Sequence, residues 1–129
     1  MKQPVDLARA YLKLADRDLK AFELLIRSRE IADETVGFHA QQAVEKCLKA
    51  VLAFSSIPFR KTHDLQELMD LLIDNKKTLP PNAEKLDVLN PYAVLLRYDF
   101  IDVAQGFDRT AAREIVLSVR AWAEKQIAS

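Results

Sequence analysis

Four short segments carry the side chains that could bind or transform a ligand. They are Asp18, the set His39, Gln42, Lys46 and Lys49, the run Thr62-His63-Asp64-Leu65, and the run Arg97-Tyr98-Asp99. Lysine and arginine bind phosphate groups, and histidine transfers protons near neutral pH. The chemistry open to these segments is therefore phosphate binding and proton transfer, provided that the fold brings them together.

The stretch 38–54 predicts a helix with two different sides. At 100° per residue, one side gathers apolar residues, namely Ala40, Ala43, Val44, Cys47, Ala50, Val51 and Phe54. The other side gathers His39, Gln41, Gln42, Glu45, Lys46 and Lys49. Two amides, an imidazole and paired charges suit a polar interface or a ligand surface as well as water.

Basic residues could form a phosphate-sized patch if they converge in space. The candidates are Lys46, Lys49, Arg60, Lys61 and Arg97. The alternative is a set of scattered surface charges with local ion pairs, such as Glu45 with Lys49 one helical turn later. The sequence leaves both open.

Metal and nucleophile chemistry have little support in this sequence. The two histidines, His39 and His63, lie on separate predicted helices and lack metal-ligand spacing. No serine lies in a Gly-x-Ser-x-Gly setting, and no glycine-rich loop is present. Cys47 lies on an apolar side and is predicted to be a buried packing residue. We expect no metal, no cofactor and no catalytic residue.

The apolar spacing predicts two long helices in the first half of the chain, over residues 4–28 and 34–55. Their short connection makes them antiparallel neighbours. Asp18 falls inside the apolar stripe of the first helix and needs a partner if it is buried. The predicted stripe is Leu7, Tyr11, Leu14, Ala15, Phe22, Leu25 and Ile26.

The pattern of residues in the second half of the chain predicts two or three further helices. Together with the first two they make a single all-α domain over residues 1–129, an up-and-down bundle of four to five helices. The predicted segments are a helix capped by Thr62 that ends before Asn75, a helix from about Pro81 with a kink at Pro91, a loop over 98–106, and a last helix from about Asp108.

Composition limits the class of protein. Lys plus Arg and Asp plus Glu number 19 each, so the net charge is zero. This argues against a nucleic-acid binder held by bulk charge and permits self-association. A single cysteine allows no internal disulfide, no apolar run could span a bilayer, and the N-terminal residues lack a secretion signal. We expect a cytoplasmic protein without a membrane contact.

Four elements in order resemble the HEPN family (higher eukaryotes and prokaryotes nucleotide-binding), and the likeness covers nearly the whole chain. The elements are Ala15-Asp16-Arg17-Asp18-Leu19, the run from Phe38 to Ala50, Thr62-His63-Asp64-Leu65 followed by Leu68, and Arg97-Tyr98-Asp99 in place of an Arg-Tyr-Pro segment.

The resemblance implies a helical bundle that forms a homodimer. Many HEPN proteins are metal-independent ribonucleases with an arginine followed, after four to six residues, by histidine. Here Asp102, Val103 and Ala104 stand where that histidine would follow Arg97. The ribonuclease motif is therefore absent, and the resemblance disfavours an enzymatic function.

Small members without the motif are often paired with a minimal nucleotidyltransferase. The resemblance thus implies the binding subunit of a two-component, toxin–antitoxin-like module that binds that enzyme, with nucleotide or RNA as a further candidate ligand. The residues expected to contact the ligand are Asp18, Gln42, Lys46, Lys49, His63 and Arg97.

Two alternatives stay open. The first is a ribonuclease that uses Arg97 with a displaced base such as His63. The second is a purely structural dimeric scaffold, in which Asp18 and its neighbours form a network that only orders the bundle.

Overall fold

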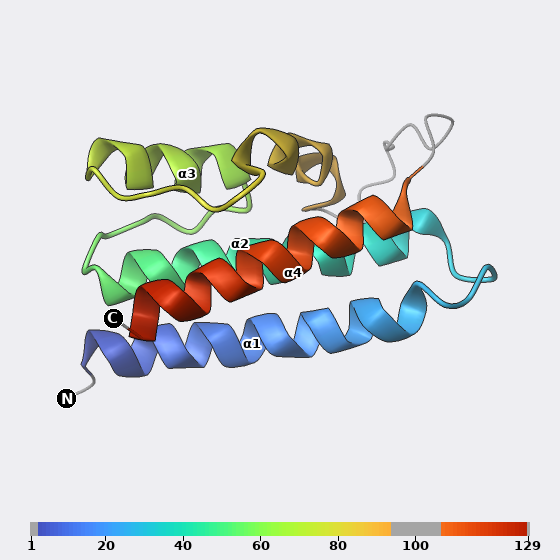
Figure 1. The fold of residues 1–129 in the computed structure, drawn as a ribbon, viewed down its shortest axis with the longest axis horizontal. Helices are drawn as coiled ribbons and strands as arrows, with labels where there is room; N and C mark the ends of the chain where they lie inside the picture. The colour runs from blue at the N-terminus through green and yellow to red at the C-terminus, as the bar shows by residue number, and fades with distance from the viewer. Residues whose placement is uncertain (1–2, 94–106, 129) are drawn as a thin grey trace.

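The computed structural model describes residues 3–93 and 107–128, which form an all-α fold without a strand in these ranges (Figure 1). The four α-helices pack together as a bundle, which confirms the predicted fold class. None of the described helices is both long and apolar enough to cross a membrane. The elements are α1 (Pro4–Leu25), α2 (Asp33–Phe54), α3 (Leu65–Asp74), the 3-10 helices η1 (Ala83–Val88) and η2 (Asn90–Ala93), and α4 (Arg109–Ala128).

The helix α2 lies at the centre of the molecule. It packs against α1, against α4, and against α3 and η2, and in Figure 1 α4 crosses in front of it between α1 and α3. Its buried residues lie all round the helix and include polar side chains such as Gln41, Glu45 and Lys49. A helix buried on several sides hides much of its polar face as well as its apolar face. Most of the polar side of α2, which the sequence predicts to face solvent or a ligand, is therefore buried inside the protein.

The turn between α1 and α2 is fastened by Arg109 at the start of α4. Its guanidinium donates hydrogen bonds to the end of α1 and to the turn, and it pairs with the carboxylate of Asp33 at 3.0 Å. Carbonyl groups left free at a helix end need such donors. The accepting carbonyls belong to Leu25, Ile26, Ser28 and Ile31.

The buried face of α1 is rotated from the predicted stripe. Ala8, Leu12, Ala15 and Phe22 are buried, whereas Leu7 and Leu14 are exposed. Of these buried residues, the predicted stripe contained Ala15 and Phe22 and missed the first two. The error arose because Leu7 and Leu14 lie at the edge of the core face, and a helical stripe read from spacing alone does not fix its centre.

The third helix begins later than predicted. The sequence predicts Thr62 as its N-cap, but Asp64 fills this position and accepts a hydrogen bond from the backbone N–H of Gln66 at 3.0 Å. The Thr62 hydroxyl accepts from the N–H of Asp64 at 3.1 Å and orders the preceding turn. Both residue types are good caps, and the one nearest the apolar run is used.

The predicted helix from Pro81 is replaced by η1 and η2. Asn82 adopts a left-handed conformation with φ of 62° before η1, and Pro91 lies in η2. Tyr92 in η2 packs on Gly37 of α2 so closely that a Cβ on Gly37 would lie 2.4 Å from the Tyr92 ring. The rest of this prediction, including Arg97 and the loop over 98–106, lies outside the described residues.

Ion pairs join the outer edges of α1 and α4, which run antiparallel. Their partners are Glu23 with Arg113 at 2.9 Å, Asp16 with Arg120 at 2.7 Å, and Arg9 with Glu124 at 2.7 Å. The hydrogen bond from Arg9 holds the pKa of Glu124 below its usual value. Exposed pairs of this kind fix the register of two helices more than they stabilise the fold.

Candidate functional site

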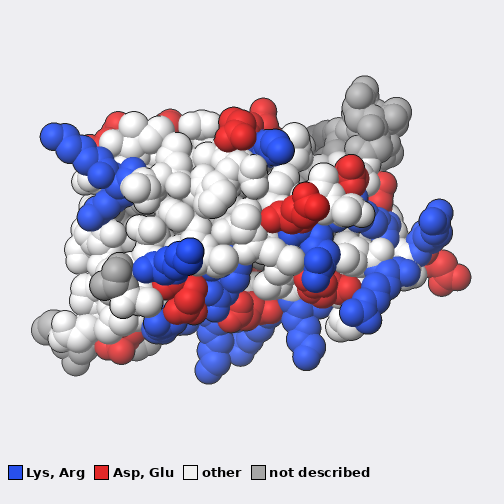
Figure 2. All heavy atoms as spheres, viewed as in Figure 1, with Lys and Arg blue, Asp and Glu red and all other residues white. Residues whose placement is uncertain are grey.

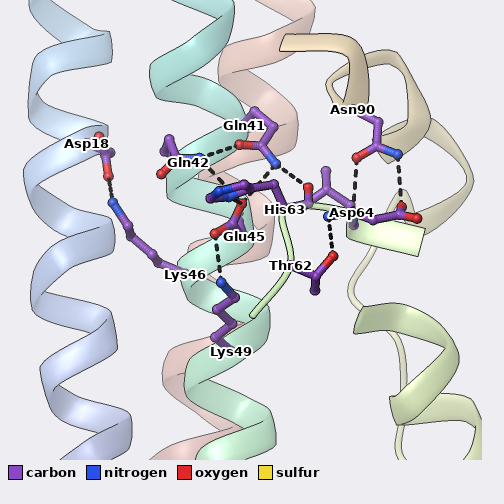
Figure 3. A network of polar contacts seen from close by, with 11 residues as sticks. Asp18, Gln41, Gln42, Glu45, Lys46, Lys49, Thr62, His63, Asp64 and Asn90 are labelled. Atoms are coloured by element: carbon purple, nitrogen blue, oxygen red, sulfur yellow. Dashed lines mark hydrogen bonds and ion pairs between the residues drawn. The ribbon is translucent and has the colours of Figure 1, made fainter. Parts of the chain in front are cut away.

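The polar side chains of α2 belong to two separate centres; Figure 3 shows the contacts around Glu45 and the pair of Asp18 with Lys46. We name them by their carboxylates. The Glu45 centre consists of Gln41, Gln42, Glu45, Lys49 and His63, and the Asp18 centre consists of Asp18, His39 and Lys46.

The carboxylate of Glu45 is enclosed by four donors. The Glu45 side chain is only 3% exposed. Its Oε2 accepts from Nζ of Lys49 at 2.9 Å, and its Oε1 lies 3.0 Å from Nδ1 of His63. The amides of Gln41 and Gln42 donate to Oε1 at 3.2 and 3.4 Å. A buried carboxylate is tolerated when its lone pairs are filled in this way.

The segment that carries His63 is held in place by hydrogen bonds from the side chains of Gln41 and Asn90. The Gln41 amide donates to the His63 carbonyl at 2.9 Å. Beyond it, the Asn90 amide donates to Asp64 at 3.0 Å, and the Asn90 side-chain oxygen accepts from the N–H of Leu65 at 3.0 Å. The Asn90 hydrogen bond lowers the pKa of Asp64. The imidazole of His63 thus stands on a fixed stretch of chain between α2 and α3.

The Asp18 centre lies nearer to solvent and ties α1 to α2. One Asp18 oxygen lies 3.0 Å from Nδ1 of His39, and the other accepts a hydrogen bond from the Lys46 ammonium. The Asp18 side chain is 13% exposed, and its two partners are more exposed than it is. Water or a ligand can therefore reach the outer parts of His39 and Lys46.

Each centre pairs a carboxylate with the Nδ1 atom of a histidine. Such a contact fixes the orientation of the ring and leaves Nε2 to meet another group. The His63 side chain is 55% exposed even though its Nδ1 contacts a buried carboxylate. The arrangement could hold a phosphate oxygen or exchange a proton at the outer edge of the ring.

The structure divides the predicted ligand residues between the two centres. Gln42, Lys49 and His63 surround Glu45, whereas Asp18 and Lys46 meet each other on the α1 side. Arg97 lies outside the described residues. The predicted ligand residues that the structure describes thus lie in two clusters, and both clusters are supported by α2.

The predicted basic patch is largely neutralised within the fold. Lys46 pairs with Asp18, Lys49 with Glu45, and Arg60 with Glu67 at 2.7 Å. The local ion pair predicted for Glu45 and Lys49 is confirmed, whereas Lys46 and Arg60 pair with carboxylates that lie 28 and seven residues away in the sequence.

Glu45, Gln41 and His39 belong to the centres but were not among the six residues expected to contact the ligand, although His39 was named among the side chains that could bind one. Gln41, Glu45 and Lys49 are spaced four residues apart, so they share one stripe of α2. This spacing could have predicted that Glu45 accepts hydrogen bonds from its two neighbours on the stripe. The two His contacts depend on tertiary structure and had no such signal.

Cys47 is buried and packs in the hydrophobic core, as predicted. Burial raises the pKa of its thiol to about 12. A thiol in this state is not a nucleophile at neutral pH. Among the described residues, no three His, Cys, Asp or Glu side chains gather as a metal site.

The family model of the HEPN domain matches residues 8–125, and the chain therefore belongs to the HEPN domain family. The helical bundle and the polar stripe of α2 both lie within the matched range.

A protein of Methanocaldococcus jannaschii named "Putative toxin MJ1304" is 35% identical to this chain over 57 residues. The similar region covers 44% of this chain and 36% of that relative, so the chain matches about a third of the relative's length. No solved structure matches the chain.

Proposed function

We propose that this protein is the binding subunit of a two-component, toxin–antitoxin-like module. The observation that carries the proposal is the HEPN match over residues 8–125. The similarity to the archaeal protein named as a toxin, over 57 residues, supports the same role. The absence of the Arg-x4–6-His motif from the sequence favours binding over catalysis.

The partner in this proposal is a minimal nucleotidyltransferase, and the subunit acts as a homodimer. The zero net charge is compatible with self-association. A hollow in the surface near the start of α1 has mainly apolar walls that include Leu7, Tyr11, Ile57 and Phe59. Leu7 in this wall is exposed, an apolar hollow of this kind is typical of surfaces that meet another protein, and a second copy is the occupant that we propose here.

The ligand contacts in this proposal are the solvent-exposed atoms of Lys46 on α2 and of His63 on the segment before α3. Lys46 and His63 reach solvent and could meet the phosphate of a nucleotide or of RNA, together with Arg97. Asp18, Gln42 and Lys49 support them from within the fold. Cations of this kind bind phosphate, and imidazole adds a donor that depends on its protonation state.

Affinity capture of the tagged chain from its native host, with mass spectrometry of the eluted proteins, tests the module directly. We expect a small nucleotidyltransferase in near-stoichiometric amount, and a dimer of the chain by light scattering. A strictly monomeric chain at micromolar concentration that captures no such enzyme would contradict the proposal. A tagged unrelated helical bundle from the same host is the control for non-specific capture.

A second candidate function is RNA cleavage by a displaced base. It is favoured by the contact of His63 with Glu45, because a carboxylate that orients an imidazole is a common support for a proton-transfer group. It predicts RNA cleavage that disappears in both Arg97→Ala and His63→Gln and persists in Lys61→Gln. Equal cleavage by all four proteins would identify a contaminating nuclease and eliminate this candidate.

A further inference from the structure

The outward side of α1 carries a straight row of exposed residues. We define the α1 outer row as Ala10, Lys13, Arg17, Lys20 and Leu24, all of which are exposed. Leu24 is 58% exposed, which is high for a large apolar residue. In Figure 2, basic side chains project along the lower edge of the molecule, where Figure 1 places α1.

The cations of the α1 outer row have no carboxylate partner among the described residues. Lys13, Arg17 and Lys20 lie beside two carboxylates of α1, but those are already engaged. Asp16 binds Arg120 at 2.7 Å, and Glu23 binds Arg113 at 2.9 Å. The arginines of α4 thus occupy the two carboxylates nearest to the row and leave its three positive charges without a partner.

The row lies along one face of α1, where it could meet a second helix, but its three middle positions carry cations where a coiled coil has apolar residues. Successive members are three, four, three and four residues apart, which is the repeat of the inner positions of a coiled coil. At a rise of 1.5 Å per residue the row is about 21 Å long, or two heptads. Three cations occupy the middle, and the apolar Ala10 and Leu24 occupy the two ends.

We propose that the α1 outer row docks an acidic helix of a partner protein. The partner helix would place carboxylates opposite Lys13, Arg17 and Lys20 and an apolar residue opposite Leu24. The proposal rests on the two-component function proposed above and names the surface and the charge of the contact.

The charges and the apolar end of the α1 outer row favour an acidic protein helix over two other occupants, a second copy of this chain and a nucleic acid. A second copy would bring three cations against three cations, which repel. A nucleic acid could neutralise the cations but offers a phosphate backbone to Leu24, and the row carries no aromatic side chain for stacking on bases. Only a protein helix satisfies both the charges and the apolar end.

A peptide-binding experiment with the full chain tests this proposal. The probe is a labelled 21-residue helical peptide with glutamates at three middle seam positions and leucine at both ends, followed by fluorescence anisotropy at low salt. The test variant is Lys13→Glu/Arg17→Glu/Lys20→Glu. The matched control is Lys61→Glu/Lys77→Glu/Lys85→Glu, which changes the net charge equally at exposed lysines on other segments. Circular dichroism melts verify that all variants fold.

We expect the test variant to bind the acidic peptide at least tenfold more weakly and the control less than twofold more weakly. A peptide with lysine in place of glutamate should regain affinity for the test variant. Equal losses in both variants, or no binding by the wild type, would overturn the proposal. A labelled RNA that binds through the same row while the peptide does not would also overturn it, in favour of a phosphate track.

The failure of this inference and the failure of the proposed function can be told apart. If the wild-type chain captures a nucleotidyltransferase and the test variant captures it equally well, the α1 outer row is not the docking surface and the module stands. If the peptide binds as expected but no such enzyme is captured, the row stands and the proposed partner is wrong.

Discussion

The Glu45 centre and the Asp18 centre contain the same chemical groups at two depths. Each joins a carboxylate, a lysine ammonium and the Nδ1 atom of a histidine. The Glu45 side chain is almost fully enclosed and has two additional amide donors, whereas the Asp18 side chain meets only its lysine and its histidine. The number of partners thus rises with depth, because a buried carboxylate must replace all the water that it loses.

The two centres also differ in what they connect. Lys49 and Glu45 belong to the same helix, and His63 alone brings in another segment. Asp18 instead joins α1 to α2 through both of its contacts. The Glu45 centre is therefore suited to hold the His63 segment rigidly, while the Asp18 centre leaves Lys46 and His39 accessible to a ligand.

The largest effect that separates the centres is expected for Glu45→Ala. Removal of this carboxylate leaves the buried Lys49 ammonium without its anion, which costs about 3–5 kcal/mol of the free energy of unfolding. Urea denaturation followed by circular dichroism measures the loss. The double variant Glu45→Leu/Lys49→Met should recover part of it, because an apolar pair needs no partner. A loss below about 1 kcal/mol in Glu45→Ala would show that this centre is not structural.

The thiol of Cys47 provides a contrast to the Glu45 carboxylate. It is a titratable group that is equally buried but stays neutral. Its pKa is raised by burial from 9.0 to about 12, so between these values the unfolded chain has released a proton that the folded chain retains. Stability must therefore fall as pH rises above 9, by about 1.4 kcal/mol per pH unit and about 2 kcal/mol by pH 10.5.

Urea denaturation of the wild type and of Cys47→Ala at pH 8 and pH 10.5 measures this slope. The variant is less stable at both pH values because it leaves a small cavity, so the comparison is made on the change with pH. Parallel slopes in the two proteins would mean that Cys47 ionises as easily in the folded chain as in the unfolded one.

A smaller effect is expected for Asp18→Asn, which keeps the shape of the side chain and removes its charge. We expect a loss of about 1–2 kcal/mol, since the partners of Asp18 can turn to water. A double-mutant cycle of Asp18→Asn with Lys46→Met, measured by thermal denaturation, isolates the ion pair. If Asp18→Asn costs as much as Glu45→Ala, the difference in depth between the centres has no energetic meaning.

The smallest effect is expected at the helix cap next to His63. Asp64→Ala removes the hydrogen bond to the Gln66 N–H and should cost about 1 kcal/mol at pH 7. The pKa of Asp64 is lowered in the folded chain, chiefly by Asn90. Its contribution is thus complete above the unfolded value of about 3.9 and is lost as pH falls through the folded value.

Thermal melts of Asp64→Ala and the wild type at a series of pH values down to 2 follow this loss. Asp74→Ala, at an exposed position near the end of the same helix, is the control and should show little change. A difference between wild type and Asp64→Ala that grows toward low pH would contradict the assigned direction of the pKa.

The sequence allowed the long helices and the ion pair of Glu45 with Lys49 to be predicted, because periodicity and i, i+4 contacts are local properties. It did not allow the burial of the polar side of α2 to be predicted, because that depends on α1, α3 and α4 packing round it. The apolar residues Leu86 and Leu89 suit an α-helix and a 3-10 helix equally, so their spacing predicts one helix where the structure has η1 and η2. The contacts of His39 and His63 join residues 18 to 21 positions apart and could not be predicted from spacing.

The central proposal is that Lys46 and His63 bind a nucleotide or RNA with their solvent-exposed atoms, while the Glu45 centre holds the His63 segment from within. The most direct test is a titration of the isotope-labelled chain with ATP and with a short RNA, followed by NMR of backbone and histidine side-chain signals. We expect saturable shifts confined to His39, Lys46, His63 and their neighbours, abolished in Lys46→Met and retained in Lys61→Met. Saturable shifts located elsewhere, or none with either ligand, would contradict the claim.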